Sequence, residues 1–172
     1  MTTDKPAWLM TLDELSALPL PPEPPELTPE EGVALIRELN AKSRSVTMEE
    51  YAFLAHQPPI RETAAVERAL GHLREELRAT PEDPFLKGVH DAFAWAYGHQ
   101  QLGPVSGQPT EKKPPRWSDL GEEATVAADA LTGALDDPPQ LPQSYIVGVE
   151  HTMLWLQCGT DDPPAGPLQQ PR

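Results

Sequence analysis

The sequence predicts an all-α fold, a helical bundle of about six helices arranged as three α-hairpins with flexible proline-rich termini. Apolar residues recur at three- and four-residue steps along six stretches, which is the spacing of one face of an α-helix. Proline, glycine and capping residues stand at the ends of these stretches, where helices usually begin and end. Two of the stretches also resemble each other, which indicates an internal duplication.

The duplicated unit is clearest in residues 85–98 and 145–159. Aligned without a gap, the two stretches pair Phe85 with Tyr145, Leu86 with Ile146, Gly88 with Gly148, Val89 with Val149, and Trp95 with Trp155. A helix of similar pattern precedes each stretch, so the repeat is expected to extend over residues 61–98 and 118–159. We therefore expect the last two hairpins to be related by an approximate two-fold axis.

Glycine at equivalent positions inside both repeat helices requires a shared cause, because glycine inside a helix costs about 1 kcal/mol relative to alanine. We expect the two helices to cross at Gly88 and Gly148, where the missing side chains allow close approach. The alternative is that each glycine packs beneath another side chain. Trp95 and Trp155 are expected in the core with their N–H groups hydrogen-bonded nearby, and a ligand cage is the alternative for them.

The first 27 residues are expected to hold a short helix followed by a polyproline spacer. Residues 11–14, with the sequence Thr-Leu-Asp-Glu, have the spacing of a capping box, and residues 19–27 contain five prolines, which favour an extended, stiff chain. The apolar residues around the helix start are Trp8, Leu9, Met10 and Leu12. Packing back on the protein's own core is the preferred interpretation for them, and binding to a partner is the alternative that makes them the partner-binding candidates.

A helical domain is expected over residues 28–159. It opens with the clearest helix start in the chain, Thr28 followed by Pro29 and two glutamates. The helices are predicted at residues 29–42, 47–56, 61–79, 83–98, 118–136 and 143–158, with Ser118 as the N-cap of the fifth. The glycine- and proline-rich residues 99–116 predict a mobile linker, and residues 160–172 predict a disordered tail.

The charge of the chain disfavours two classes of partner. With 27 acidic and 13 basic residues, the formal net charge is −14, which opposes direct binding to nucleic acid or to an anionic membrane. A basic protein is the natural complement, and solubility alone is the simpler explanation. The sequence shows no signal peptide and no long apolar span, so a cytoplasmic location is expected. The one cysteine, Cys158, is expected to be a buried thiol.

Enzyme signatures are absent, since the sequence has no phosphate-binding glycine loop, CxxC, HExxH or GxSxG motif. We therefore expect no catalysis and no cofactor. The repeat alignment sets His90 against Glu150 and Asp91 against His151, and such a donor set suits Zn²⁺ or non-haem iron. Adjacent residues on a helix point about 100° apart, so polar helix flanks are the preferred interpretation and no metal is expected.

These observations favour a non-catalytic interaction protein, an acidic adaptor, inhibitor or accessory subunit that binds a basic protein surface. Two alternatives stay open. One is a helical domain that binds a small molecule or a metal, and the other is a structural or assembly component of a phage or plasmid. The composition, rich in alanine, proline and arginine, fits a GC-rich bacterial genome or its phage. The oligomeric state, including a homodimer, stays open.

Overall fold

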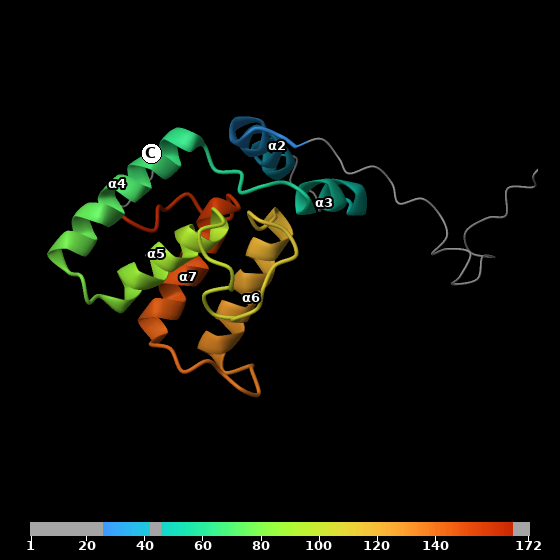
Figure 1. Ribbon diagram of the computed structural model, residues 1–172. Coiled ribbons are helices and arrows are strands. Elements are labelled where there is room, and N and C mark those ends of the chain that lie inside the picture. Colours follow the sequence, from blue (N-terminus) through green and yellow to red (C-terminus); the bar gives the residue numbers. More distant parts are fainter. Residues whose placement is uncertain (1–25, 42–45, 167–172) are drawn as a thin grey trace, which may run out of the picture.

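The computed structural model describes residues 26–41 and 46–166 (Figure 1). The regular elements in these ranges are α2 (Pro29–Ala41), α3 (Met48–Ala55), α4 (Thr63–Ala79), α5 (Pro84–Ala96), α6 (Trp117–Thr132) and α7 (Gln143–Leu156). All of them are helices, so the predicted all-α bundle is confirmed. The N-terminal residues predicted to bind a partner, Trp8, Leu9, Met10 and Leu12, lie outside the described residues.

The central contact of the bundle is the crossing of α5 and α7, which is the most extensive helix packing in the described chain. A Cβ atom added to Gly88 would overlap the carbonyl oxygen of Tyr145, and one added to Gly148 would overlap the carbonyl oxygen of Phe85. The two contacts are reciprocal, because Phe85 and Tyr145 occupy equivalent positions in the repeat. The predicted glycine crossing is confirmed, with each repeat helix meeting the other at its own glycine.

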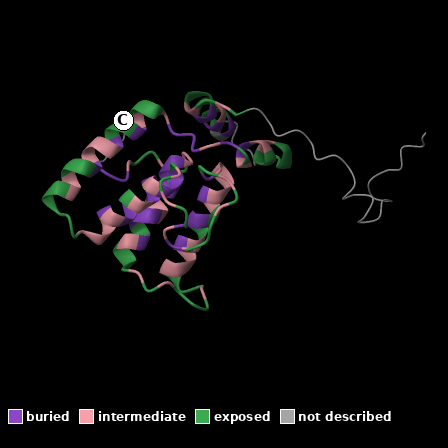
Figure 2. Cartoon of the chain, viewed as in Figure 1, coloured by how far each residue is buried: buried purple, intermediate pink, exposed green. Residues whose placement is uncertain are grey.

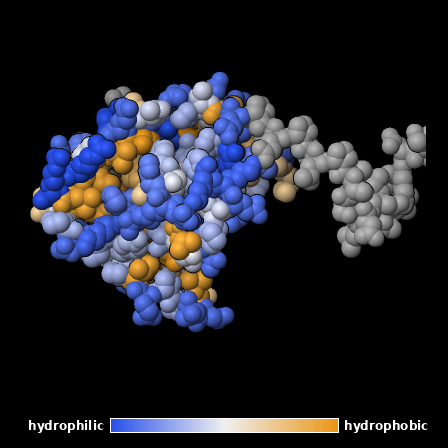
Figure 3. Space-filling model, viewed as in Figure 1, coloured by the Kyte–Doolittle hydropathy of each residue, from blue (hydrophilic) through white to orange (hydrophobic). Residues whose placement is uncertain are grey.

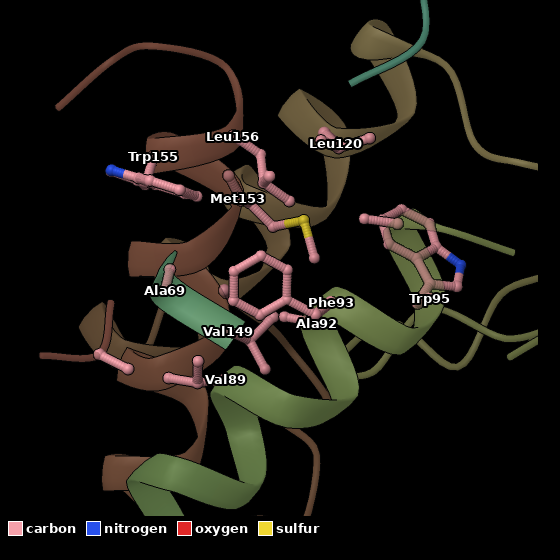
Figure 4. Close-up of a cluster of buried hydrophobic side chains, with 14 of the residues drawn as sticks. Ala69, Val89, Ala92, Phe93, Trp95, Leu120, Val149, Met153, Trp155 and Leu156 are labelled. Atoms are coloured by element: carbon pink, nitrogen blue, oxygen red, sulfur yellow. The ribbon is translucent and has the colours of Figure 1, made fainter. Parts of the chain in front are cut away.

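The main hydrophobic core surrounds this crossing (Figures 2 and 4). The inward side chains of α5 and α7 are almost fully buried, among them Val89, Ala92, Phe93, Val149, Met153 and Leu156. Trp95 and Trp155 are 1% and 3% exposed, so both belong to the core as expected. The rings of Phe93 and Trp155 meet edge to face with their centroids 6.2 Å apart, a favoured aromatic geometry.

A smaller hydrophobic cluster joins the first two helices to the bundle. It contains Ile36, Leu39, Leu54 and Ile60. Buried Gln57 lies at the junction, where its Oε1 accepts the N–H of Leu27 at 2.7 Å and its backbone carbonyl accepts the N–H of Trp117, also at 2.7 Å. The entry to α2, the end of α3 and the start of α6 are therefore tied to a single residue.

The two repeat hairpins differ in how their outer helices pack. Helix α6 packs extensively along α7, whereas α4 contacts α5 over a much smaller area. The two hairpins are therefore most alike in their inner helices, which cross at the glycines. The outer position of α4 leaves a groove between α4 and α5.

The predicted boundaries of the fifth helix need correction. Helix α6 begins at Trp117 and ends at Thr132, because Gly133 adopts the left-handed conformation (φ 74°) that ends a helix. Ser118 is not its N-cap; the Ser118 hydroxyl instead donates to the carbonyl of Ala55 at 3.0 Å. At the helix start, the Asp119 carboxylate accepts the N–H of Arg116 at 2.6 Å.

The predicted mobile linker at residues 99–116 packs on α6. Buried Glu123 accepts the N–H groups of Val105 and Ser106 through the same Oε1 atom, at 2.6 and 3.0 Å. Val105 and Pro115 are themselves buried. A buried carboxylate thus holds the loop, although the glycine and proline content predicts mobility.

The predicted disordered tail is also ordered over residues 160–166. The Arg61 guanidinium lies 4.7 Å from the ring centre of Trp155 and donates from Nε to the Trp155 carbonyl at 2.9 Å. It also donates to the carbonyl of Thr160, and Ala165 is buried in the main core. Arg61 therefore holds both the end of α7 and the segment that follows; residues 167–172 lie outside the described residues.

Candidate functional site

The four weak metal candidates do not converge. His90 Nδ1 lies 2.9 Å from Asp91 Oδ1, and Asp91 Oδ2 accepts the Tyr145 hydroxyl at 2.9 Å. His151 makes its contact elsewhere, with its Nε2 2.8 Å from the carbonyl oxygen of Asp162. Over residues 26–41 and 46–166, no three His, Cys, Asp or Glu side chains are grouped in a way that would hold a metal ion.

The Asp91–Tyr145 hydrogen bond belongs to the helix crossing. Burial, together with the hydrogen bond and the negative charge of Asp91, raises the pKa of the Tyr145 phenol well above its usual value. The hydrogen bond therefore stays intact at neutral pH and links α5 to α7. Its equivalent in the repeat is absent, since Phe85 has no hydroxyl group.

Cys158 has the character of a structural thiol. Burial raises its pKa above the ordinary range for cysteine, and its Sγ lies 4.0 Å from the carbonyl oxygen of Ile60. A thiol with a raised pKa contains little of the reactive thiolate at neutral pH. Cys158 is only partly buried, so the prediction of a buried thiol holds in part, and the raised pKa offers no support for a nucleophile.

One pocket of about 610 Å³ lies between α3, α6 and the 104–112 loop. Trp95 forms part of its lining, and its indole nitrogen points away from the core side chains in Figure 4. That nitrogen is buried and has no hydrogen-bond partner among the described residues. The prediction that the Trp95 N–H is hydrogen-bonded nearby is therefore wrong. Because the nitrogen is itself covered, a ligand in this pocket would not reach it.

A larger and more open groove of about 820 Å³ lies where α3, α6 and α7 meet. Tyr51 and Leu154 expose apolar surface there, at 49% and 39% of their full areas. The Trp117 ring lines the groove beside Tyr51 and meets it edge to face, with 6.2 Å between ring centres. Two aromatic rings and a leucine therefore make an apolar floor, which is typical of surfaces that bind another protein.

The polar residues of this groove have one sign of charge. Glu122 of α6 and Glu150 of α7 line it, and none of its lining residues is basic. We call this surface the acidic groove. An apolar floor with carboxylates at its margin suits an apolar helix face that is flanked by lysine or arginine.

The acidic groove combines residues that sequence reasoning treated in other ways. The sequence places Glu150 among the weak metal candidates and Trp117 directly before the predicted fifth helix. Their proximity depends on the contact between α3 and α6, which no local pattern predicts. The single usable signal is the exposed tyrosine on a short helix, because aromatic residues are enriched in protein interfaces.

Comparisons with protein-family models, curated protein sequences and solved structures found no match to this chain. None of the helices among the described residues has both the length and the apolar character needed to cross a membrane.

Proposed function

We propose that this protein is a non-catalytic interaction protein whose acidic groove binds a basic amphipathic helix of a partner protein. The observation that carries the proposal is the pairing of Tyr51, Trp117 and Leu154 with Glu122 and Glu150 in one groove without a basic residue. The net charge of −14 supports it, because the field of the whole chain would attract a basic partner.

Helix binding in a groove explains both parts of this surface. The apolar floor would supply most of the binding free energy by excluding water. The two glutamates would orient the helix and speed its association, since charges at an interface edge affect specificity and on-rate more than affinity. The partner is therefore expected to carry lysine or arginine beside an apolar stripe at three- and four-residue spacing.

A photo-crosslinking amino acid tests where the partner binds. We would place it at Thr125, which lines the acidic groove, and at Thr132, an exposed residue on the same helix outside the groove. Each variant is expressed in the cells in which the protein normally occurs. A defined crosslinked product is expected from the variant with the crosslinker at position 125 only. Equal products from both positions, or none from position 125, would contradict the proposal.

A matched pair of substitutions then tests the mechanism. Leu154→Asp changes the groove, and Val147→Asp changes a residue on the same helix outside it; the two residues are 39% and 38% exposed. Leu154→Asp should reduce capture of the crosslinked partner by at least about tenfold, a loss of about 1.4 kcal/mol, while Val147→Asp leaves it unchanged. Similar losses in both variants would indicate a general effect on the fold.

A further inference from the structure

A second groove, between α4 and α5, differs from the acidic groove in its charge. It encloses about 300 Å³, and Leu73, Leu77 and Phe93 are among the apolar residues that line it. Its polar groups come from Arg74, His90, His99 and the Tyr97 hydroxyl, and none of the described residues that line it is acidic. Arg74 supplies a permanent positive charge to this lining. The His90 ring, in contrast, contacts the Asp91 carboxylate. We call this surface the α4–α5 groove.

The α4–α5 groove follows from the loose packing of α4. Helix α4 contacts α5 over a small area, so Leu70, Leu77 and Tyr97 remain partly exposed instead of closing on each other. Figure 3 shows hydrophobic side chains along α4 beside its polar outer surface. Apolar side chains gathered in a groove make this surface a candidate docking site.

We propose that the occupant is the chain's own N-terminal segment, residues 8–15. This segment combines apolar Trp8, Leu9 and Leu12 with acidic Asp13 and Glu14. Its apolar side chains match the floor of the α4–α5 groove, and its carboxylates match Arg74 at the margin. The acidic groove is the poorer site for it, since Glu122 and Glu150 would repel the same carboxylates.

The connecting chain gives the N-terminal segment a reach of about 30 Å from its anchor. The described structure begins at Glu26, whose carboxylate accepts from Arg116 Nη1 at 2.6 Å, and Leu27 is bonded to Gln57. Thirteen residues, 13–25, separate Leu12 from this anchor. Residues 19–25 span about 22 Å at about 3.1 Å per residue in polyproline conformation, and residues 13–18, expected to be helical, add about 9 Å at about 1.5 Å per residue. A stiff spacer also costs less entropy to order than a flexible one.

Disulfide trapping in the full-length chain tests the proposal. In a Cys158→Ser background, Met10→Cys is combined with Arg74→Cys or His99→Cys in the α4–α5 groove, or with Thr125→Cys in the acidic groove as the control. All three groove positions are exposed, so the cysteines should not disturb packing. Under mild oxidation, at least one α4–α5 pair should form an intramolecular disulfide about tenfold faster than the control pair.

A second variant separates specific docking from random encounter. Adding Leu12→Asp to the faster α4–α5 pair should lower its rate to that of the control, because the apolar contact is lost while the chain length is unchanged. Equal rates for all three pairs would overturn the proposal. A covalent dimer as the main product would also overturn it, since the occupant would then be the segment of a second copy.

Discussion

Gly88 and Gly148 determine how closely α5 and α7 approach. At Gly88, a methyl group would overlap the carbonyl of Tyr145 in the first turn of α7, and helix backbone atoms packed against the core cannot move aside cheaply. Gly88→Ala is therefore expected to lower the free energy of unfolding by about 3 kcal/mol or more. Urea denaturation followed by circular dichroism measures the loss.

Gly71 provides the matched control for that substitution. It lies inside α4, and a methyl group added there would meet no atom within 4 Å. Gly71→Ala should raise the free energy of unfolding by about 0.5–1 kcal/mol, since alanine is the better helix former. If Gly88→Ala stabilised the protein to the same extent, the close crossing would be wrong.

Because of Tyr145, the free energy of unfolding is expected to change with pH in the alkaline range. The raised pKa of its phenol in the folded state means that the unfolded chain, with a tyrosine pKa of about 10, releases the proton first. The contribution of Tyr145 is thus complete below pH 10 and declines as pH rises above it. Denaturation midpoints between pH 8 and 11 should fall less steeply in Tyr145→Phe than in the parent; parallel curves would refute this.

At the level of whole elements, the 99–116 loop owes its order to α6. Glu123 accepts two loop N–H groups, and Gly103 lies so close to its carboxylate that a side chain there would overlap it. Leaving a buried N–H group without a partner costs about 1–3 kcal/mol. The two hydrogen bonds to Glu123 therefore act together with the burial of Val105 and Pro115 in holding the loop.

Glu123→Ala should release this loop. We expect a loss of about 2–4 kcal/mol in the free energy of unfolding and faster hydrogen exchange at the amides of Val105 and Ser106. The neighbouring substitution Glu122→Ala, at an exposed position, should change stability by less than about 0.5 kcal/mol. Unchanged amide exchange in Glu123→Ala would mean that the loop is held by other contacts.

The helix pairs show how far duplication controls architecture. Sequence similarity between residues 85–98 and 145–159 predicted the inner pair and its crossing. It did not predict the different packing of α4 and α6, because their partners include the unrelated α3 and the C-terminal segment. The α4–α5 groove exists because of that difference.

Across the whole molecule, the hydrophobic interior is divided unequally. Among the residues that the structure describes, the cluster around the α5–α7 crossing holds nineteen buried residues, whereas the cluster formed by α2, α3 and Ile60 holds four. Free energies of local opening follow the amount of buried apolar contact. The backbone amides of α2 and α3 should therefore exchange at lower free energy than those of α5 and α7 in native-state hydrogen exchange, and uniform protection would show that the protein opens as one unit.

The two grooves give the molecule two surfaces of different charge. The acidic groove is lined by glutamates and by no basic residue, and the α4–α5 groove is lined by an arginine and by no acidic residue. A net charge of −14 summed over the chain conceals this difference. Composition therefore predicted a basic partner, while the location of the surface that would bind it required coordinates.

The amino-acid sequence was enough for the helices, most of their ends and the glycine crossing. Capping residues, prolines and apolar periodicity act over a few neighbouring positions, and the repeat alignment compares two such local patterns directly. The sequence was insufficient to predict the roles of Arg61, Gln57 and Glu123, the order of the 99–116 loop and of residues 160–166, or either groove. Arg61 bonds a carbonyl 94 positions away, and such pairings arise only once packing has brought distant segments together and removed water from around them.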